Sequence, residues 1–205
     1  MMAKNKSGRL VVELWCEGKV EEEYFKGLTG ELELDHVGFK IKNLRGGNYG
    51  SIWRRLERDP YLDKVMIIAD LDRARCDKVE AENLLKLISY VKKNKGSRFL
   101  FLTCENFEDW LRYHFIDGTQ KSREKMYEKF GVRGAQDFKR DCENIYERVK
   151  QRGGDIACAE SYFGNLRERQ GVFCDVCCKM VERAKVSDLQ STLCDFREVV
   201  RNLKP

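Results

Sequence analysis

Five acidic residues closely follow apolar segments of this 205-residue chain. They are Glu17, Glu21, Asp70, Asp72 and Glu108. Carboxylates brought close together repel one another, and a hard divalent cation with oxygen ligands, Mg²⁺ or Mn²⁺, removes that repulsion. If the fold collects these side chains, the sequence predicts a site for such a cation.

The apolar segments before these acidic residues have the composition of β-strands. Residues 9–16, 64–69 and 98–103 are apolar runs typical of buried strands, and residues 37–44 alternate like a half-exposed strand. Helical spacing lies between and after them, over residues 19–28, 52–56, 76–93 and 107–115. This alternation predicts an α/β fold, with a parallel sheet flanked by helices on both faces.

The acidic residues are expected to converge at one edge of this sheet, because ligands gather where parallel strands end. In extended backbone, Asp70 and Asp72 would point the same way. Gly18 allows a tight turn from strand into helix. Glu21 then falls in the first helical turn, where the helix dipole favours negative charge, four residues beyond Glu17.

Each acidic element also has an ordinary structural explanation. Glu17 taken alone is a loop carboxylate, and residues 21–23 form a solvated first turn. Asp70 and Asp72 would cap the following helix or pair with nearby arginines. The conjunction of an acidic residue after the first strand and Asp-x-Asp after a later one favours the cation site.

The chain after residue 115 has a different pattern. No strand is expected there, and the helical segments are residues 121–130, 137–151, 156–168 and 173–201. We predict an α/β metal-binding core over residues 1–118 and an all-helical C-terminal region, residues 119–205, packed on it. A separate domain of about 85 residues is the alternative.

Charge and composition bound the class of protein. The 39 basic and 34 acidic residues give a net charge of +5, most of it after residue 120, which permits a polyanionic partner such as nucleic acid. No apolar run approaches the roughly 20 residues that cross a bilayer, so no membrane association is expected. Residues 1–9 are polar and basic, which argues against a secretory signal and for a cytoplasmic location.

The nine cysteines are expected to be thiols in that compartment. Cys174, Cys177 and Cys178 begin like half a zinc site, but no second C-x-x-C follows. Buried thiols on a helix are the favoured interpretation, and zinc is not expected. Cys158 as a remote fourth ligand keeps the zinc alternative open.

The acidic layout resembles the Toprim domain of topoisomerases, primases and overcoming-lysogenization-defect nucleases, and more narrowly the RloB-like family. That family's E-G-x-T-E-x-x-Y-F is matched by residues 17–25 with Val20 for threonine, and its D-x-D-R by residues 70–73. Its F-E-x-W-x-x-x-H-F is matched by residues 107–115. The family's motif has S-N-P just before this block, where the present chain has TCE at residues 103–105. This difference affects the expected shape of the loop before the helix and not the helix itself.

The resemblance implies metal-dependent phosphodiester chemistry and a role for each residue. Glu17 would be a metal ligand or general base, Glu21, Asp70 and Asp72 metal ligands, and Glu108 would orient water or complete the metal shell. Three cations would hold a phosphate: Lys19, Arg73 and Arg75. His114 would hydrogen-bond Glu108 or touch substrate, and its alternative is a satisfied histidine beneath aromatic residues.

The function that follows is a Mg²⁺-dependent Toprim-type nuclease acting on DNA or RNA, including transfer RNA, in antiphage defence. The resemblance also implies a partner ABC-type ATPase, since the chain has no G-x-x-x-x-G-K-[ST] of its own. The alternative is a non-catalytic subunit that binds nucleic acid or the ATPase. Nucleotidyl transfer, as in primases, has no further motif in its support.

Overall fold

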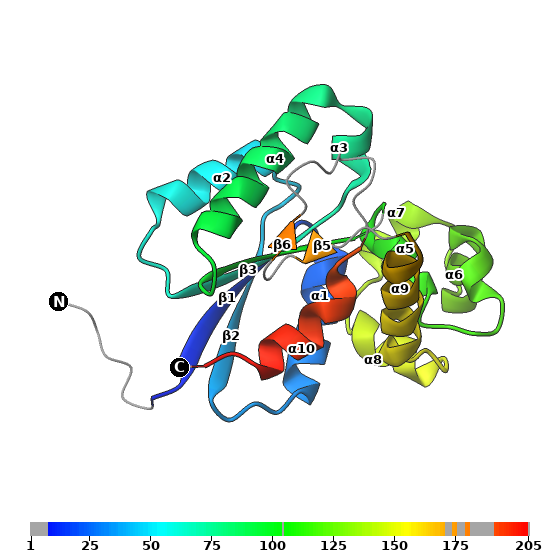
Figure 1. Ribbon diagram of the computed structural model, residues 1–205. Coiled ribbons are helices and arrows are strands. Elements are labelled where there is room, and N and C mark those ends of the chain that lie inside the picture. The colour runs from blue at the N-terminus through cyan, green and yellow to red at the C-terminus, as the bar shows by residue number, and fades with distance from the viewer. Residues whose placement is uncertain (1–7, 104, 171–173, 176–178, 181–190, 205) are drawn as a thin grey trace.

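A four-stranded parallel sheet organises the molecule (Figure 1). The computed structural model describes residues 8–103, 105–170, 174–175, 179–180 and 191–204, without the side chains of 167–170, 174–175 and 179–180. The strand order is β2-β1-β3-β4, with every neighbouring pair parallel. The strands are β1 (Leu10–Cys16), β2 (Val37–Asn43), β3 (Lys64–Ala69) and β4 (Arg98–Leu102). The α/β fold expected from the sequence is confirmed.

Helices flank both faces of the sheet (Figure 1). They are α1 (Lys19–Glu31), α2 (Tyr49–Arg58), α3 (Asp72–Cys76), α4 (Lys78–Lys93), α5 (Phe107–Arg112), α6 (Arg123–Phe130), α7 (Ala135–Arg140), α8 (Ile145–Gln151), α9 (Ile156–Gln170) and α10 (Phe196–Arg201), with 3₁₀ turns η1 (Thr119–Lys121) and η3 (Leu193–Asp195). Helices α2 and α4 cover one face, and α1 and α10 cover the other. No helix in the described ranges combines the length and apolar character needed to span a membrane.

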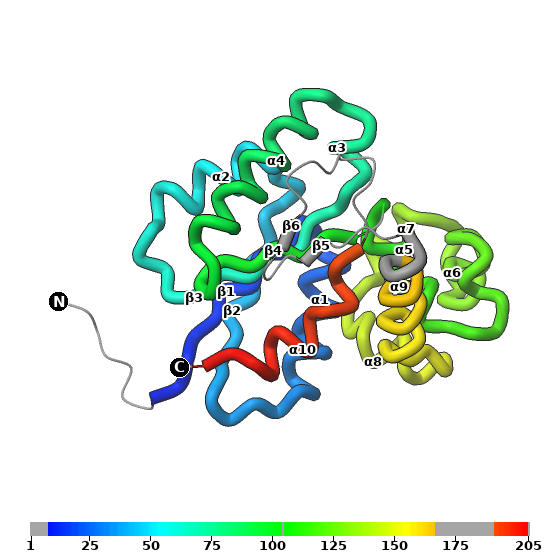
Figure 2. The backbone as a smooth tube through the Cα atoms, viewed as in Figure 1, coloured from blue at the N-terminus to red at the C-terminus, as the bar shows by residue number. Residues whose placement is uncertain are grey.

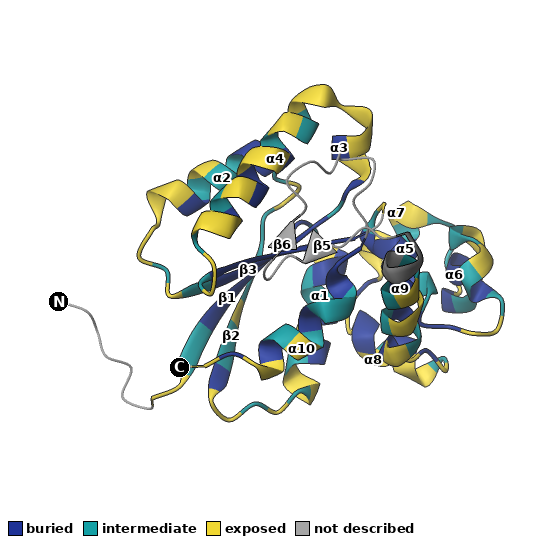
Figure 3. Cartoon of the chain, in the orientation of Figure 1, coloured by how far each residue is buried: buried dark blue, intermediate teal, exposed yellow. Residues whose placement is uncertain are grey.

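The two central strands are apolar on both sides because each face carries its own core (Figure 3). Leu14 pairs with Met66, and both belong to the core shared with α1. Trp15 pairs with Ile67, and both belong to the core shared with α2 and α4. Alternate residues of one strand therefore enter opposite cores, which explains the continuous apolar runs in the sequence.

The chain leaves the sheet after β4, passes through helices α5 to α9, and returns as α10 (Figure 2). On its return Phe196 packs against Phe25 of α1, with ring centroids 4.8 Å apart, and against Phe101 of β4 at 5.3 Å. The later helices share the α1 core with the sheet. The boundary at residue 118 stays a prediction.

The outer edge of β4 is covered by residues 191 and 192. Thr192 N donates to Leu102 O at 2.9 Å, and Thr192 Oγ1 accepts from Leu102 N at the same distance. Ser191 Oγ adds a bond of 3.0 Å to the same carbonyl. Both residues are fully buried, so the backbone N–H and C=O of Leu102 are satisfied at this edge without a further strand.

Two expectations for the C-terminal region are wrong. Residues 173–201 are not one helical segment, since β5 (Cys174–Asp175) and β6 (Lys179–Met180) form a two-stranded antiparallel sheet. Strands of two residues are too short to leave a periodic pattern. The segment 137–151 divides into α7 and α8 around Asn144, which has a left-handed φ of 52°, a conformation that asparagine tolerates.

The cysteine expectations are addressed in part. Cysteines 16, 76, 142 and 158 are free thiols, as expected. The side chains of Cys174, Cys177 and Cys178 are outside the described part of the structure. The zinc alternative that involves them therefore stays a prediction.

Replacing Thr192 tests the covered edge of β4. Thr192→Val leaves the buried Leu102 N–H without an acceptor and is expected to lower the free energy of unfolding by about 1–3 kcal/mol in urea denaturation. Thr192→Ser, which keeps the hydroxyl, is the matched control and should lose clearly less. Equal losses in the two variants would contradict this account of the edge.

Candidate functional site

Glu17 and Asp70 meet where β1 and β3 end. The parallel register pairs Cys16 with Ile68, so the residues that follow the two strands lie next to each other. Glu17 is buried, and its Oε2 accepts a hydrogen bond of 3.2 Å from the backbone N–H of Asp70. The sheet thus brings together two of the acidic residues singled out in the sequence, which are 53 positions apart.

Glu21 joins this edge from the first turn of α1, where it is buried. Gly18, just before α1, has φ −133° and ψ −177°, an extended conformation open to any residue. A Cβ at this position would lie 2.8 Å from Glu21 Oε2. The chain does turn tightly from β1 into α1 at this position, as expected, but the backbone there does not require glycine; a side chain at position 18 would instead displace the Glu21 carboxylate.

The backbone does not stay extended from Asp70 to Asp72, as the sequence analysis expected. Leu71 has φ −88° and ψ −12°, so the chain turns at once and α3 begins at Asp72. Asp72 is exposed, and its Oδ1 accepts from the backbone N–H of Arg73 at 2.6 Å. The extended Asp-x-Asp geometry is therefore wrong, although the Asp72 charge is still close enough to raise the pKa of Glu17 and of Asp70.

Asp70 is fixed by two hydroxyl groups that the sequence analysis did not assign. Thr103 Oγ1, directly after β4, donates to Asp70 Oδ1 at 2.7 Å. The Tyr49 hydroxyl at the start of α2 donates to the Asp70 carbonyl oxygen. Thr103 was recognisable as the residue in the serine position of the S-N-P motif, whereas Tyr49 had no signal beyond its place in a turn-rich segment.

Glu108 reaches the site from α5 and is buried. Lys139 of α7 places its Nζ 3.6 Å from Glu108 Oε1, although the lysine side chain is 64% exposed. The same ammonium group acts to lower the pKa of Glu17 and of Glu21. Sequence reasoning missed Lys139 because it is one of many basic residues in the helical region and belongs to no motif.

Burial and mutual repulsion raise the proton affinity of these carboxyl groups. Burial raises the pKa of Glu21 to about 7, and the charges of Glu108 and Glu17 add to that shift. Burial, followed by the charges of Glu21 and Glu17, also holds the pKa of Asp70 well above its usual range. The pKa of Glu17 is raised by burial, and the Asp70 N–H and the Arg73 guanidinium partly offset this. The acidic residues therefore form one interacting group.

Of the three expected phosphate-binding cations, Arg73 contacts the acidic residues directly. Its Nη2 lies 3.0 Å from Glu17 Oε1, and its Nη1 donates to the Gly46 carbonyl at 3.1 Å. Gly46 N in turn donates to the Glu17 carbonyl at 2.8 Å. Lys19 and Arg75 are exposed residues of α1 and α3.

The expected substrate role of His114 is corrected by the structure. The ring is 1% exposed and lies between Tyr24 and Trp110. Its Nε2 is 2.7 Å from the Tyr24 hydroxyl, and its Nδ1 is 3.1 Å from the Trp110 carbonyl. These contacts fit a neutral ring whose Nδ1–H donates to Trp110 and whose Nε2 accepts from Tyr24. His114 is therefore a satisfied interior histidine.

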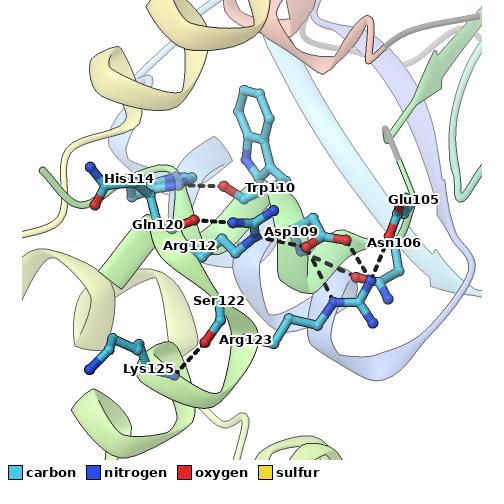
Figure 4. Close-up of polar contacts among 10 residues, drawn as sticks. All are labelled: Glu105, Asn106, Asp109, Trp110, Arg112, His114, Gln120, Ser122, Arg123 and Lys125. Atoms are coloured by element: carbon cyan, nitrogen blue, oxygen red, sulfur yellow. Dashed lines mark hydrogen bonds and ion pairs between the residues drawn. The ribbon is translucent and has the colours of Figure 1, made fainter. Parts of the chain in front are cut away.

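A cluster of ion pairs fixes α5, the helix that carries Glu108 (Figure 4). The buried Asp109 accepts from Arg112 Nε at 2.8 Å and from Arg123 Nη2 at 2.7 Å. Burial raises the pKa of Asp109, but Arg123 and Arg112 outweigh it and leave the pKa below its usual value. The carboxylate next to Glu108 is thus ionised and held by two arginines.

The donor chemistry at this edge fits a hard divalent ion. Its oxygens come from carboxylates and hydroxyl groups, the ligands that Mg²⁺ and Mn²⁺ prefer. Within the described parts of the chain, no three His, Cys, Asp or Glu side chains are already arranged around one point as ligands. Glu17 faces Arg73 and Glu108 faces Lys139, so an ion would replace these contacts.

The fold and the site define a class: an α/β protein whose parallel strands end at a group of buried, mutually repelling carboxylates. The chain matches the RloB-like protein family over residues 12–193 and belongs to that family. The resemblance read from the three motif blocks is thereby confirmed. No curated protein and no solved structure matches the chain.

The raised pKa of Glu21 predicts that its charge destabilises the fold. The folded protein holds this proton more tightly than the unfolded chain, so the favourable contribution is complete below pH 4.5 and is lost as pH rises through about 7. Glu21→Gln is therefore expected to raise the free energy of unfolding by about 1–3 kcal/mol at pH 8, measured by urea denaturation. Exposed Glu82→Gln is the control, and a Glu21→Gln variant no more stable than it would contradict the prediction.

The buried His114 predicts a second, opposite pH dependence. Burial lowers its pKa from 6.5 to about 4, so its contribution is intact above pH 6.5 and is lost as pH falls towards 4. The loss amounts to about 3 kcal/mol. His114→Gln cannot titrate, and the stability difference between wild type and this variant should shrink by that amount from pH 7 to pH 4. A difference that stays constant with pH would show that the ring does not titrate as described.

Proposed function

We propose that the protein is a Mg²⁺- or Mn²⁺-dependent nuclease that hydrolyses phosphodiester bonds in nucleic acid. The observation that carries this proposal is the meeting of Glu17, Glu21 and Asp70 at one sheet edge, where the two glutamates are buried, Asp70 is partly buried and their charges repel. Retaining such a group costs stability, which is the pattern expected where carboxylates serve a reaction.

Each acidic residue has a separate task in this reaction. Glu17, Glu21, Asp70 and Asp72 would hold the ion, and Glu108 would complete the metal shell or orient water. Such an ion would lower the pKa of a bound water and stabilise negative charge during phosphodiester hydrolysis. Thr103 keeps the Asp70 carboxylate in place through its 2.7 Å hydrogen bond.

Two cations at this edge would bind the substrate phosphate. Arg73 is 41% exposed and Lys139 is 64% exposed, so both reach solvent as well as the carboxylates they contact. If Glu17 and Glu108 held a metal ion, the positive charges of Arg73 and Lys139 would be available to the phosphate oxygens. Lys19 and Arg75 would add charge from the exposed surfaces of α1 and α3.

The family resemblance supports the biological side of the proposal. The protein would act as the effector of an antiphage defence system, on DNA or RNA including transfer RNA, under the control of a partner ABC-type ATPase. The alternative is a non-catalytic subunit that binds nucleic acid or the ATPase. The ion pairs of Glu17 with Arg73 and of Glu108 with Lys139 favour that alternative, because they neutralise carboxylates without a metal.

A double variant separates the two functions. Glu17→Gln/Asp70→Asn should lower the cleavage rate of labelled DNA, RNA or transfer RNA by about 100-fold or more in Mg²⁺ or Mn²⁺, with and without the ATPase. Binding measured in EDTA should persist, because the basic residues are unchanged. The control is Asp63→Asn, an exposed carboxylate before β3.

The outcomes are distinct for each candidate. Lost cleavage with retained binding supports the nuclease. A wild type that binds nucleic acid but cleaves none of these substrates supports the binding subunit, and a double variant that cleaves at the wild-type rate refutes the assignment of the site.

A further inference from the structure

An aromatic stack lies on the surface apart from the acidic site. Tyr113, after α5, and Tyr162 of α9 are stacked with ring centroids 3.8 Å apart and an interplanar angle of 15°. The guanidinium of Arg112 lies over the Tyr113 ring, 4.4 Å from its centroid. Two groups this close to one ring occupy its opposite faces, so the order of the stack is Arg112, Tyr113, Tyr162.

Tyr162 is the open end of this stack. Tyr113 covers one of its faces, yet Tyr162 remains 41% exposed. Phe163 contacts both tyrosines edge-on at 5.1 Å and itself stacks on Trp110 at 5.5 Å. An exposed ring supported by buried aromatic residues is pre-organised to receive another flat ring.

A hollow with lysines at its rim is connected to the stack. Arg112 Nη1 donates to the carbonyl of Gln120, the neighbour of Lys121 (Figure 4). Lys121, Lys125 and Lys129 line this hollow of about 350 Å³, together with two acidic residues, Asp117 and Glu128.

The charges in the hollow leave a positive excess. Lys129 is paired with Asp117, so Glu128 is the remaining acidic residue of the lining. Lys121 and Lys125 have no ion pair within the described part of the chain. Their ammonium groups are exposed to solvent and open to phosphate oxygens.

The same arginine network extends towards the acidic site. Asp109 joins Arg112 to Arg123, and Arg123 Nη2 reaches Glu105 Oε2 at 3.0 Å (Figure 4). The Glu105 carbonyl accepts from the backbone N–H of Asp72 at 3.0 Å. A continuous set of contacts therefore connects the stack and the hollow to the edge where the carboxylates lie.

We propose that Tyr162 and the lysines at positions 121 and 125 form a binding surface for single-stranded nucleic acid. An unpaired base stacks on the open face of Tyr162, and phosphates further along the strand lie against Lys121 and Lys125. A paired base within a duplex has no free face to offer, so the surface favours unpaired nucleotides. This proposal rests on the proposed function only in that the bound strand leads towards the carboxylates.

Binding of a fluorescein-labelled 12-nucleotide oligo-dT or oligo-U, followed by fluorescence anisotropy in EDTA with the full chain, tests the surface. Tyr162→Ala should weaken binding about tenfold, whereas Tyr162→Phe, which keeps the flat ring, should bind like wild type. The control is Tyr61→Ala, a tyrosine that is 88% exposed outside this surface. A duplex of the same length should bind more weakly and respond little to Tyr162→Ala.

The lysines are tested by the salt dependence of the same binding. Lys121→Ala/Lys125→Ala should reduce the slope of log K against log salt by about 1.4, the value for two lost phosphate contacts on a single strand. Lys40→Ala/Lys78→Ala removes two exposed lysines elsewhere and should leave the slope nearly unchanged.

Three results would overturn the proposal. They are a wild type that does not bind the single strand, a Tyr162→Ala variant that binds it like wild type or loses no more than Tyr61→Ala, and a duplex bound as tightly as the single strand. Because hydrolysis plays no part in EDTA, a protein that binds as described but never cleaves supports this surface and refutes the nuclease. A protein that cleaves but ignores Tyr162 does the reverse.

Discussion

Repulsion among buried carboxylates is the constraint on which the rest of the structure depends. The charge of Glu17 raises the pKa of Glu21 and of Asp70, and the charge of Glu21 raises that of Asp70 further. Each carboxylate would be more stable in water, where it is solvated and far from the others. They stay together because the parallel register of β1 and β3 fixes where the strands end, and because glycine at position 18 lets a carboxylate approach the backbone. The burial of the strands stabilises the fold and offsets the free-energy cost of the repulsion at this edge.

The surroundings of the carboxylates offset the repulsion only in part. A backbone N–H and the Arg73 guanidinium act on Glu17, and the Thr103 hydroxyl acts on Asp70. Lys139 approaches from α7, a helix of the C-terminal region. The charge at the sheet edge is therefore balanced by residues from the C-terminal helices as well as from the α/β core. The helical region therefore does more than cover the sheet, since it also balances charge at its edge and presents an aromatic and basic surface beside it.

The sequence was informative where one physical rule acts locally. Three apolar runs and one alternating segment predicted the four strands of the main sheet, and the position of Glu17 and Asp70 after β1 and β3 followed from strand direction. It was misleading for Asp72, because an abrupt helix start replaced the extended geometry. For His114 it left a substrate role and an interior role open, and the contact that decides for the interior role comes from Tyr24, 90 positions away. The contact of Lys139 with Glu108 could not be predicted, because the two residues are 31 positions apart and no periodic pattern relates them.

The cover on the β4 edge has a consequence for how the protein is made. Leu102 is paired with a residue 90 positions later, and Phe196 fills the core beside it. During synthesis the four strands leave the ribosome well before these partners, and β4 is then an open edge with an unfilled face beneath it. The edge at Leu102 and the core surface that Phe196 fills are therefore exposed until residues 191–203 have been synthesised and have docked.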